Sequence, residues 1–121
     1  MRMEGLRDRT TQFALRIIRL FAALPRDSLA QTLGRQILRS GTSVAANFRE
    51  ASRARSRPEF ISKLGIVEQE LDETILWLEL LVESGVFTAT KTEPLKQEAQ
   101  ELLKIVVTSI KRSKQEKTKE D

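Results

Sequence analysis

The sequence contains no cysteine and no histidine, and these two absences remove several classes of function. Without cysteine the chain can form neither a disulfide nor a thiolate metal site. Without histidine it lacks the commonest general base and the commonest metal-binding side chain. We therefore predict a protein that is not an enzyme and that holds no metal ion and no cofactor.

Long hydrophobic runs are missing as well. No stretch approaches the roughly 18 apolar residues that a membrane helix needs, and the first ten residues, MRMEGLRDRT, are too polar for a signal peptide. These features predict a cytoplasmic protein without a membrane partner. With 121 residues, 40% of them hydrophobic and 31% charged, the chain has the size and composition of one folded domain.

Glycine and proline are sparse, with five and three residues, so few positions force a helix to stop. Between these positions, apolar residues recur at helical steps of three and four. The pattern predicts four helices, over residues 5–24, about 28–55, 57–84, and from a cap at Thr92 to about 110. In the second of these helices, Asp27 or Ser28 can cap the start, and the apolar stripe consists of Leu29, Leu33, Ile37, Val44 and Phe48. Short connections favour an all-α, antiparallel up-and-down four-helix bundle. We assign residues 1–110 to this single domain and residues 111–121 to a basic tail that is frayed or disordered.

The clearest helix start is the sequence SRPE at residues 56–59. Ser56 can cap the first turn while Glu59 reaches back to the cap, an arrangement known as a capping box. Gly85 fits the position just past the end of this helix. Its apolar stripe consists of Phe60, Leu64, Val67, Leu71, Thr74, Leu78 and Leu81, widened by Ile61, Ile75, Leu76 and Leu80.

Positive and negative charges are divided unevenly along the chain. Residues 1–57 hold twelve arginines, no lysine and four acidic residues, a balance of +8. Residues 58–110 hold four lysines and ten acidic residues, a balance of −6, and residues 111–121 add +2. The two hairpins can neutralise each other within one subunit. Alternatively, the arginine-rich hairpin meets phosphate or the acidic hairpin of a neighbouring subunit.

Small and polar residues interrupt the apolar stripe of the second helix. Ser40 and Gly41 fall on or beside its buried face, where a glycine costs about 1 kcal/mol relative to alanine. Close packing against another helix, or a local kink, would offset this cost. Asn47, Glu50 and Arg53 follow at steps of three and share one edge of the helix. We interpret them as a buried hydrogen-bonded ladder that fixes register or subunit contacts, with a ligand site as the alternative.

Two other features have structural interpretations. The acidic run EQELDE at residues 68–73 resembles part of a di-iron cage, but those cages pair glutamate with histidine, which is absent here. Trp77 is the only tryptophan, and it can either anchor the core or stack on a base. We favour a packing role for Trp77.

A combination of residues then points to a family. It consists of Arg39, Ser40, Gly41, Ser43, Asn47, Glu50, Ser56, Glu59, Phe60, Glu73, Thr74, Trp77, Leu78 and Leu81. Through these residues, the segment 13–87 resembles the four-helix bundle protein family, whose members include proteins encoded by intervening sequences of bacterial 23S ribosomal RNA genes. That family is similar in fold to the accessory proteins of diversity-generating retroelements, pentameric barrels that bind nucleic acid and partner a reverse transcriptase. The resemblance implies a bacterial four-helix bundle, a homopentamer and no active site.

These observations predict a non-catalytic ring that binds RNA or DNA by charge, largely regardless of sequence. The candidate contacts are Arg49, Arg53, Arg55 and Arg57. A structural polar motif is expected from Arg39, Ser40, Gly41, Ser43, Asn47, Glu50 and Glu73. The alternative is a scaffold that binds a partner protein, such as a reverse transcriptase, without touching nucleic acid.

Overall fold

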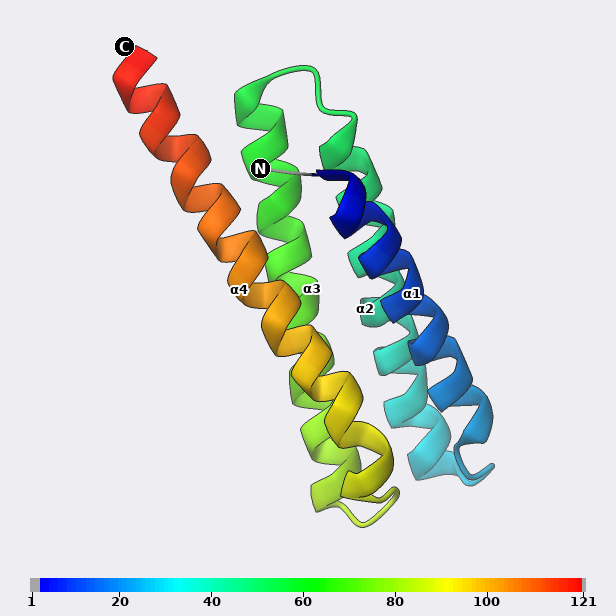
Figure 1. Ribbon diagram of the computed structural model, residues 1–121. Helices are drawn as coiled ribbons and strands as arrows, with labels where there is room; N and C mark the ends of the chain where they lie inside the picture. The colour runs from blue at the N-terminus through cyan, green and yellow to red at the C-terminus, as the bar shows by residue number, and fades with distance from the viewer. Residues whose placement is uncertain (1–2, 121) are drawn as a thin grey trace.

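The computed structural model describes residues 3–120, with side chains from residue 5 to residue 116. Successive helices run antiparallel, so both ends of the chain lie at the same end of the molecule (Figure 1). The predicted all-α, up-and-down four-helix architecture is confirmed. The helices are α1 (Met3–Ala23), α2 (Ser28–Ser52), α3 (Arg57–Glu83) and α4 (Ala89–Glu120). Met1, Arg2 and Asp121, which belong to the predicted domain and tail, lie outside the described residues.

Side chains cap the starts of α2 and α3. The Asp27 carboxylate accepts a hydrogen bond from the backbone N–H of Ala30 at 3.0 Å. Ser56 Oγ accepts one from the N–H of Glu59 at 3.2 Å, which confirms Ser56 as the cap of α3. The Glu59 carboxylate in turn accepts from the N–H of Arg55 at 2.8 Å, one residue before the cap. The capping box is therefore one residue wider than predicted.

The end of α3 is closed by Gly85, as the sequence predicts. Gly85 has φ of 80°, a left-handed conformation that glycine adopts without steric strain. The N–H of Val86 donates to the carbonyl oxygen of Leu81 at 3.1 Å, and the N–H of Gly85 donates to that of Val82 at 3.0 Å. These two bonds form a Schellman motif, which satisfies the last carbonyl groups of the helix.

α4 differs from the prediction at both ends. It begins at Ala89, so Thr92 is not its cap; Thr92 lies buried in the first turn, where its hydroxyl donates to the carbonyl oxygen of Thr88 at 3.3 Å. At the other end, residues 111–120 are helical rather than frayed or disordered. Ser113 is buried and Glu116 lies 3.8 Å from Arg57, so contacts with the bundle extend into the segment predicted to be a tail.

The core follows the predicted stripes except at three leucines. Leu76 and Leu80 are 47% and 38% exposed, although the sequence pattern added them to the buried stripe of α3. Each lies two residues from buried Leu78, and a helix with 3.6 residues per turn places them on the opposite face. Leu29, counted in the stripe of α2, is 53% exposed, and its neighbour Ala30 is buried instead.

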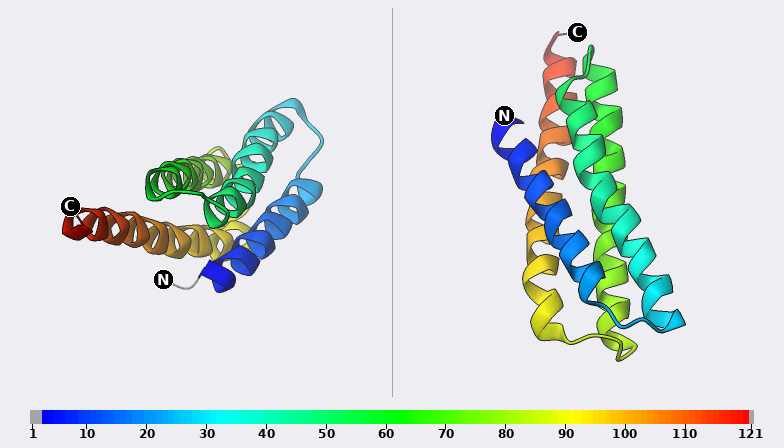
Figure 2. Two further views of the ribbon diagram at one scale, coloured as in Figure 1. Left: turned by 90° about the horizontal axis from the view of Figure 1, so that it is seen from above. Right: turned by 90° about the vertical axis from the view of Figure 1, so that its right-hand side faces the viewer.

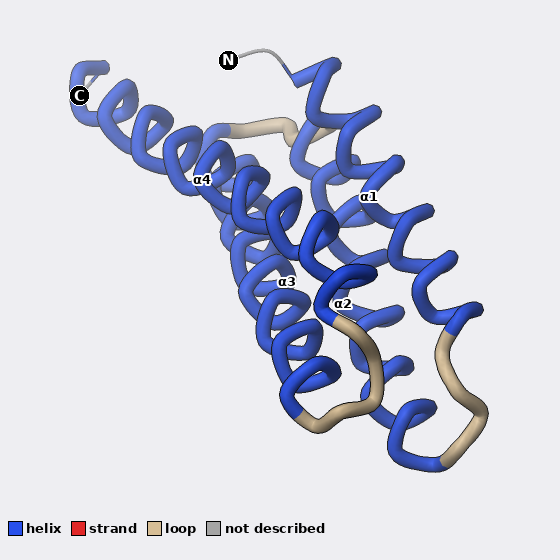
Figure 3. Tube along the Cα trace, turned by 60° about the horizontal axis from the view of Figure 1, so that its bottom comes forward, coloured by secondary structure: helices blue, strands red, loops and turns tan. Residues whose placement is uncertain are grey.

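The four helices do not close evenly around the core. α2 packs against α1 and α3, α3 packs against α4, and α1 and α4 share the least contact. Figure 2 and Figure 3 show α1 and α4 diverging toward the end of the molecule where the chain begins and ends. Both Nε and Nη2 of Arg9 on α1 lie 2.8 Å from the carboxylate of Glu98 on α4. The hydrogen bond to Glu98 raises the pKa of Arg9 above its ordinary value.

Candidate nucleic-acid interface

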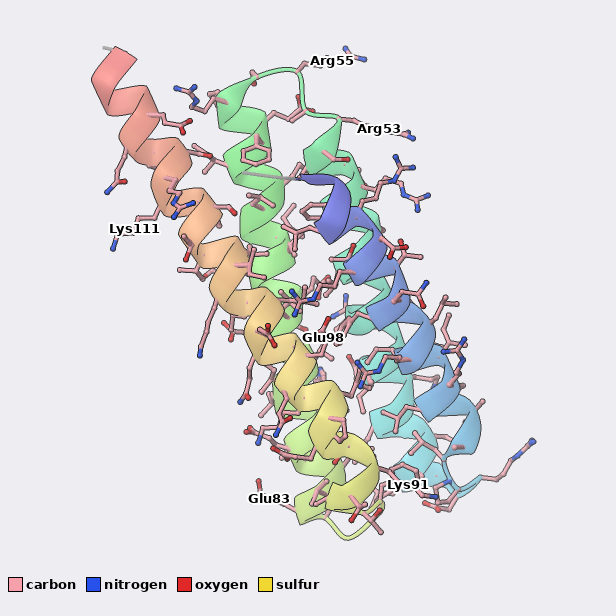
Figure 4. The ribbon with its side chains drawn as sticks, in the orientation of Figure 1. Arg53, Arg55, Glu83, Lys91, Glu98 and Lys111 are labelled. Atoms are coloured by element: carbon pink, nitrogen blue, oxygen red, sulfur yellow. The ribbon has the colours of Figure 1, made fainter. Side chains whose placement is uncertain are left out.

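Three of the four predicted arginines lie together at the connection between α2 and α3. Arg49 is in the last turn of α2, Arg53 is its C-cap, and Arg55 lies in the following loop. All three are exposed, and the side chains of Arg53 and Arg55 extend away from the helices (Figure 4). Cations are favoured at a helix C-terminus, where the last carbonyl groups point outward. This end of α2 is therefore an exposed basic surface, which we call the arginine end (Arg49, Arg53 and Arg55).

Arg57 lies apart from the arginine end. It is the first residue of α3, its side chain is 28% exposed, and its Nη2 atom lies 3.8 Å from the Glu116 carboxylate on α4. It shares a pocket of about 400 Å³ with Arg112. The sequence pattern could not reveal this pairing, because Arg57 and Arg112 belong to helices that meet only through tertiary packing.

A groove between α1 and α2 adjoins the arginine end. It has a volume of about 480 Å³, and its apolar lining includes Ala14, Leu15, Ala45 and Ala46. Arg49 and Arg53 also line it. Three of these apolar residues are alanines, which leave the groove open. Since Arg49 and Arg53 belong to the same lining, the groove and the arginine end form one continuous surface.

The seam between α2 and α3 contains a polar cluster, in agreement with part of the predicted structural motif. Ser40 and Thr74 are fully buried, and their hydroxyl oxygens form a hydrogen bond of 2.8 Å. Arg39 reaches across the same seam, with Nη1 3.2 Å from Glu70 and Nη2 2.9 Å from Glu73. The hydrogen bond to Glu70 is the main cause of a raised pKa at Arg39. These contacts join the arginine-rich hairpin to the acidic one within a single subunit.

Gly41 allows α1 and α2 to approach closely. A Cβ atom at Gly41 would lie 2.6 Å from Cγ1 of Ile17 on α1, much closer than carbon atoms pack. Gly41 is also buried. The predicted close packing of this position is therefore confirmed, and its partner is Ile17.

Asn47, Glu50 and Arg53 do not form the predicted buried ladder. The Asn47 amide donates to the carbonyl oxygen of Ser43 in its own helix at 2.9 Å. Glu50 has a side chain that is 56% exposed and lies 2.6 Å from Nζ of Lys63 on α3, a contact that raises the pKa of Lys63. Spacing by three does place the side chains along one edge. That edge is open to solvent at Glu50, however. The partner of Glu50 is therefore Lys63 on the neighbouring helix and not Asn47 or Arg53 on its own helix.

The two remaining candidates have structural roles. Trp77 is half-buried and packs against the core, which favours the packing interpretation over base stacking. Glu70 and Glu73 from the acidic run are engaged by Arg39. Among the described side chains, those of residues 5–116, no group of three or more acidic residues is placed to hold a metal ion. None of the described helices is long and apolar enough to span a membrane.

Comparisons with known proteins agree with this architecture. The sequence profile of the 23S rRNA-intervening sequence protein family matches residues 6–108. A similar solved structure is that of a protein with unknown function from the S23 ribosomal protein family of Bacteroides thetaiotaomicron VPI-5482, which is 39% identical and superposes with a TM-score of 0.85. The similarity covers 92% of this chain and 99% of that one. No protein in the curated set matches. Because the profile spans most of α1 to α4, the chain belongs to the 23S rRNA-intervening sequence protein family.

Proposed function

We propose that the protein is a non-catalytic, cytoplasmic homo-oligomer that binds RNA or DNA by charge and largely regardless of sequence. The observation that carries this proposal is the separation of charge between the two hairpins. Twelve of the thirteen arginines lie in residues 1–57, and the second hairpin is acidic. The guanidinium group of arginine can bind two phosphate oxygens at once, and a basic surface attracts nucleic acid whatever its base sequence.

Apolar side chains on the outer surface support self-association. Leu15 and Ile18 on α1 are 37% and 45% exposed, on the arginine-rich hairpin. Leu76 and Leu80 are exposed on α3, which also carries the acidic run 68–73. A basic apolar face on one subunit fits an acidic apolar face on the next, and such head-to-tail contacts close into a ring when the rotation permits. The family resemblance gives five as the expected number of subunits.

The arginine end is the part of this surface that we propose for nucleic-acid contact. Arg49, Arg53 and Arg55 are exposed, whereas Arg39 and Arg57 are engaged by acidic side chains. In a ring these three arginines would recur once per subunit. Repetition of a weak electrostatic site raises its overall affinity without any new contact.

Fluorescence anisotropy with labelled RNA and DNA tests this proposal. We expect binding to both, falling steeply with salt as phosphate contacts release counterions. The double variant Arg53→Glu/Arg55→Glu should abolish binding. The matched control is Arg26→Glu/Arg35→Glu, which changes the net charge by the same amount but lies toward the other end of α2. This control should retain most of the nucleic-acid binding. A wild-type protein that ignores both nucleic acids at low salt would overturn the proposal.

The second candidate function is a protein-binding scaffold without nucleic-acid contact. It is favoured by the exposure of Leu76 and Leu80, which a partner protein such as a reverse transcriptase could cover instead of a second copy. This candidate would be favoured by a stable oligomer that binds no nucleic acid. It would also be favoured if self-association did not need Leu76 and Leu80.

A further inference from the structure

A second basic site adjoins the α2–α3 connection, in the pocket of Arg57 and Arg112. The pocket has a volume of about 400 Å³ and lies between the end of α2, the start of α3 and the late turns of α4. Ser56 and Ser113 add hydroxyl groups to its lining, and Phe60 adds an aromatic ring. Its volume falls within the roughly 300–1,000 Å³ typical of pockets for small organic ligands.

The groups in this pocket suit a phosphate attached to an organic residue. Two guanidinium groups can each bind a tetrahedral oxyanion through paired hydrogen bonds. Ser56 Oγ accepts from the N–H of Glu59, which leaves the hydroxyl hydrogen of Ser56 able to donate to a ligand. Ser56 also marks the N-terminus of α3, the end of a helix that favours an anion. The ring of Phe60 provides an apolar wall for a sugar or a base.

We propose that this pocket binds a phosphate monoester, carried either by a free nucleotide or by the 5′ end of a nucleic-acid strand. Two cations match the two negative charges of a monoester better than the single charge of a backbone diester. The site is separate from the arginine end, so the inference does not require the diffuse binding described above.

Glu116 is the internal competitor for this site. Its carboxylate lines the pocket 3.8 Å from Nη2 of Arg57, and its side chain is 65% exposed. Ion pairs with such exposed groups are weak, so an incoming dianion can displace Glu116. Removing this carboxylate should therefore strengthen binding of a phosphate monoester.

The variant Arg112→Gln tests the proposal, because Arg112 is exposed and its replacement should not unfold the chain. The matched control is Lys111→Gln, which removes a neighbouring charge whose side chain projects outward from α4 and does not line the pocket (Figure 4). Titration calorimetry would compare adenosine 5′-monophosphate with adenosine. Fluorescence anisotropy would compare one oligonucleotide with and without a 5′-phosphate, at salt high enough to screen diffuse contacts.

We expect the phosphorylated member of at least one pair to bind at least about tenfold more tightly than its unphosphorylated counterpart. Arg112→Gln should remove this preference, Lys111→Gln should leave it, and Glu116→Gln should increase it. Preference for the nucleotide alone identifies a small-molecule site, and preference for the phosphorylated strand identifies an end-binding site. If neither phosphate is preferred, or if Arg112→Gln and Lys111→Gln have the same effect, the proposal is wrong. Salt-sensitive binding to unphosphorylated strands would meanwhile leave the function of the arginine end intact.

Discussion

Glycine residues at two positions set the distance between α1 and α2. A Cβ atom at Gly41 would lie 2.6 Å from Ile17, and one at Gly34 would lie 2.6 Å from Leu24. A Cβ atom added at Gly65 on α3 would have no such neighbour within 4 Å. Glycine is unfavourable in all three helical positions, but only Gly34 and Gly41 gain close packing in return.

The substitution Gly41→Ala should therefore destabilise the fold, although alanine is the better helix former. We expect a loss of about 1–3 kcal/mol in the free energy of unfolding, because the added methyl group overpacks against Ile17. Gly65→Ala is the matched control and should be neutral or stabilising by up to about 1 kcal/mol. Urea unfolding at a fixed protein concentration measures both changes. An equal gain in stability for the two variants would contradict the close-packing interpretation.

The role of a single residue could be predicted where its own position in a helix required that role. It could not be predicted where the role depends on a side chain from another helix. Gly41 stood out because an unfavourable residue at a core position requires a compensating contact. Spacing by three predicts a buried ladder at Glu50, because it is the only signal that the sequence carries at this position. Its actual partner, Lys63, comes from the next helix, and its exposure depends on how α2 and α3 pack. Neither fact is contained in the spacing of side chains along one helix.

At the scale of helices, the α2–α3 seam combines a buried polar pair with a surface ion cluster. Ser40 and Thr74 hydrogen-bond each other in the interior, and Arg39 engages Glu70 and Glu73 at the surface. Buried hydroxyl groups are tolerated only when paired, so the inner bond favours one register of α2 against α3. The exposed arginine cluster contributes less, because solvent screens it.

Thr74→Val should break this buried pair with little change in side-chain shape. We expect a loss of about 1–3 kcal/mol in the free energy of unfolding, because Ser40 loses its cross-helix partner. The double variant Ser40→Ala/Thr74→Val should lose less than the sum of the two single changes. Thr32→Val is the control, because its hydroxyl is exposed and bonds only within α2. Strict additivity in urea unfolding would show that the pair does not couple the helices.

Helix boundaries were predictable where side chains act on their own backbone. Asp27, Ser56 and Gly85 close helix ends as their chemistry requires. Thr92 has the same capping chemistry but lies inside α4, because the chain already turns into a helix at Ala89. The divergence of α1 from α4 has no counterpart in any local pattern. It arises from how three pairs of neighbouring helices pack.

At the scale of the whole molecule, charge and exposed apolar area divide between the same two hairpins. The sequence predicted the charge division directly, because residue counts do not depend on folding. The sequence did not predict that Leu76 and Leu80 face outward. A wide buried stripe and a second, exposed apolar face give similar spacings of apolar residues along a helix. The sequence pattern also groups Arg57 with the arginine end, whereas the Arg57 side chain lies 3.8 Å from Glu116 on α4. Tertiary packing therefore decides which apolar side chains are exposed for assembly and which arginines are exposed for nucleic-acid binding.

Self-association through these two faces should fail when either face is made polar. We expect Leu15→Asn/Ile18→Asn and Leu76→Asn/Leu80→Asn each to convert the oligomer to a monomer, because burial of apolar side chains provides most of the association energy. Light scattering gives the mass, and circular dichroism checks that the helices are retained. Leu29→Asn is the control, since Leu29 is 53% exposed at the start of α2 and belongs to neither pair.

Mixing the two double variants distinguishes a head-to-tail contact from a symmetric one. The first variant keeps an intact α3 face and the second keeps an intact α1 face, so a head-to-tail contact lets one copy of each combine. That pair has no further intact face to extend, and it should stop at a dimer of one subunit of each kind. A symmetric contact between identical faces would instead leave one variant self-associating and the other monomeric, with no new species on mixing. The mass of the mixture therefore decides whether the opposed charges of the two hairpins meet between subunits, which is the condition for a ring that repeats the arginine end.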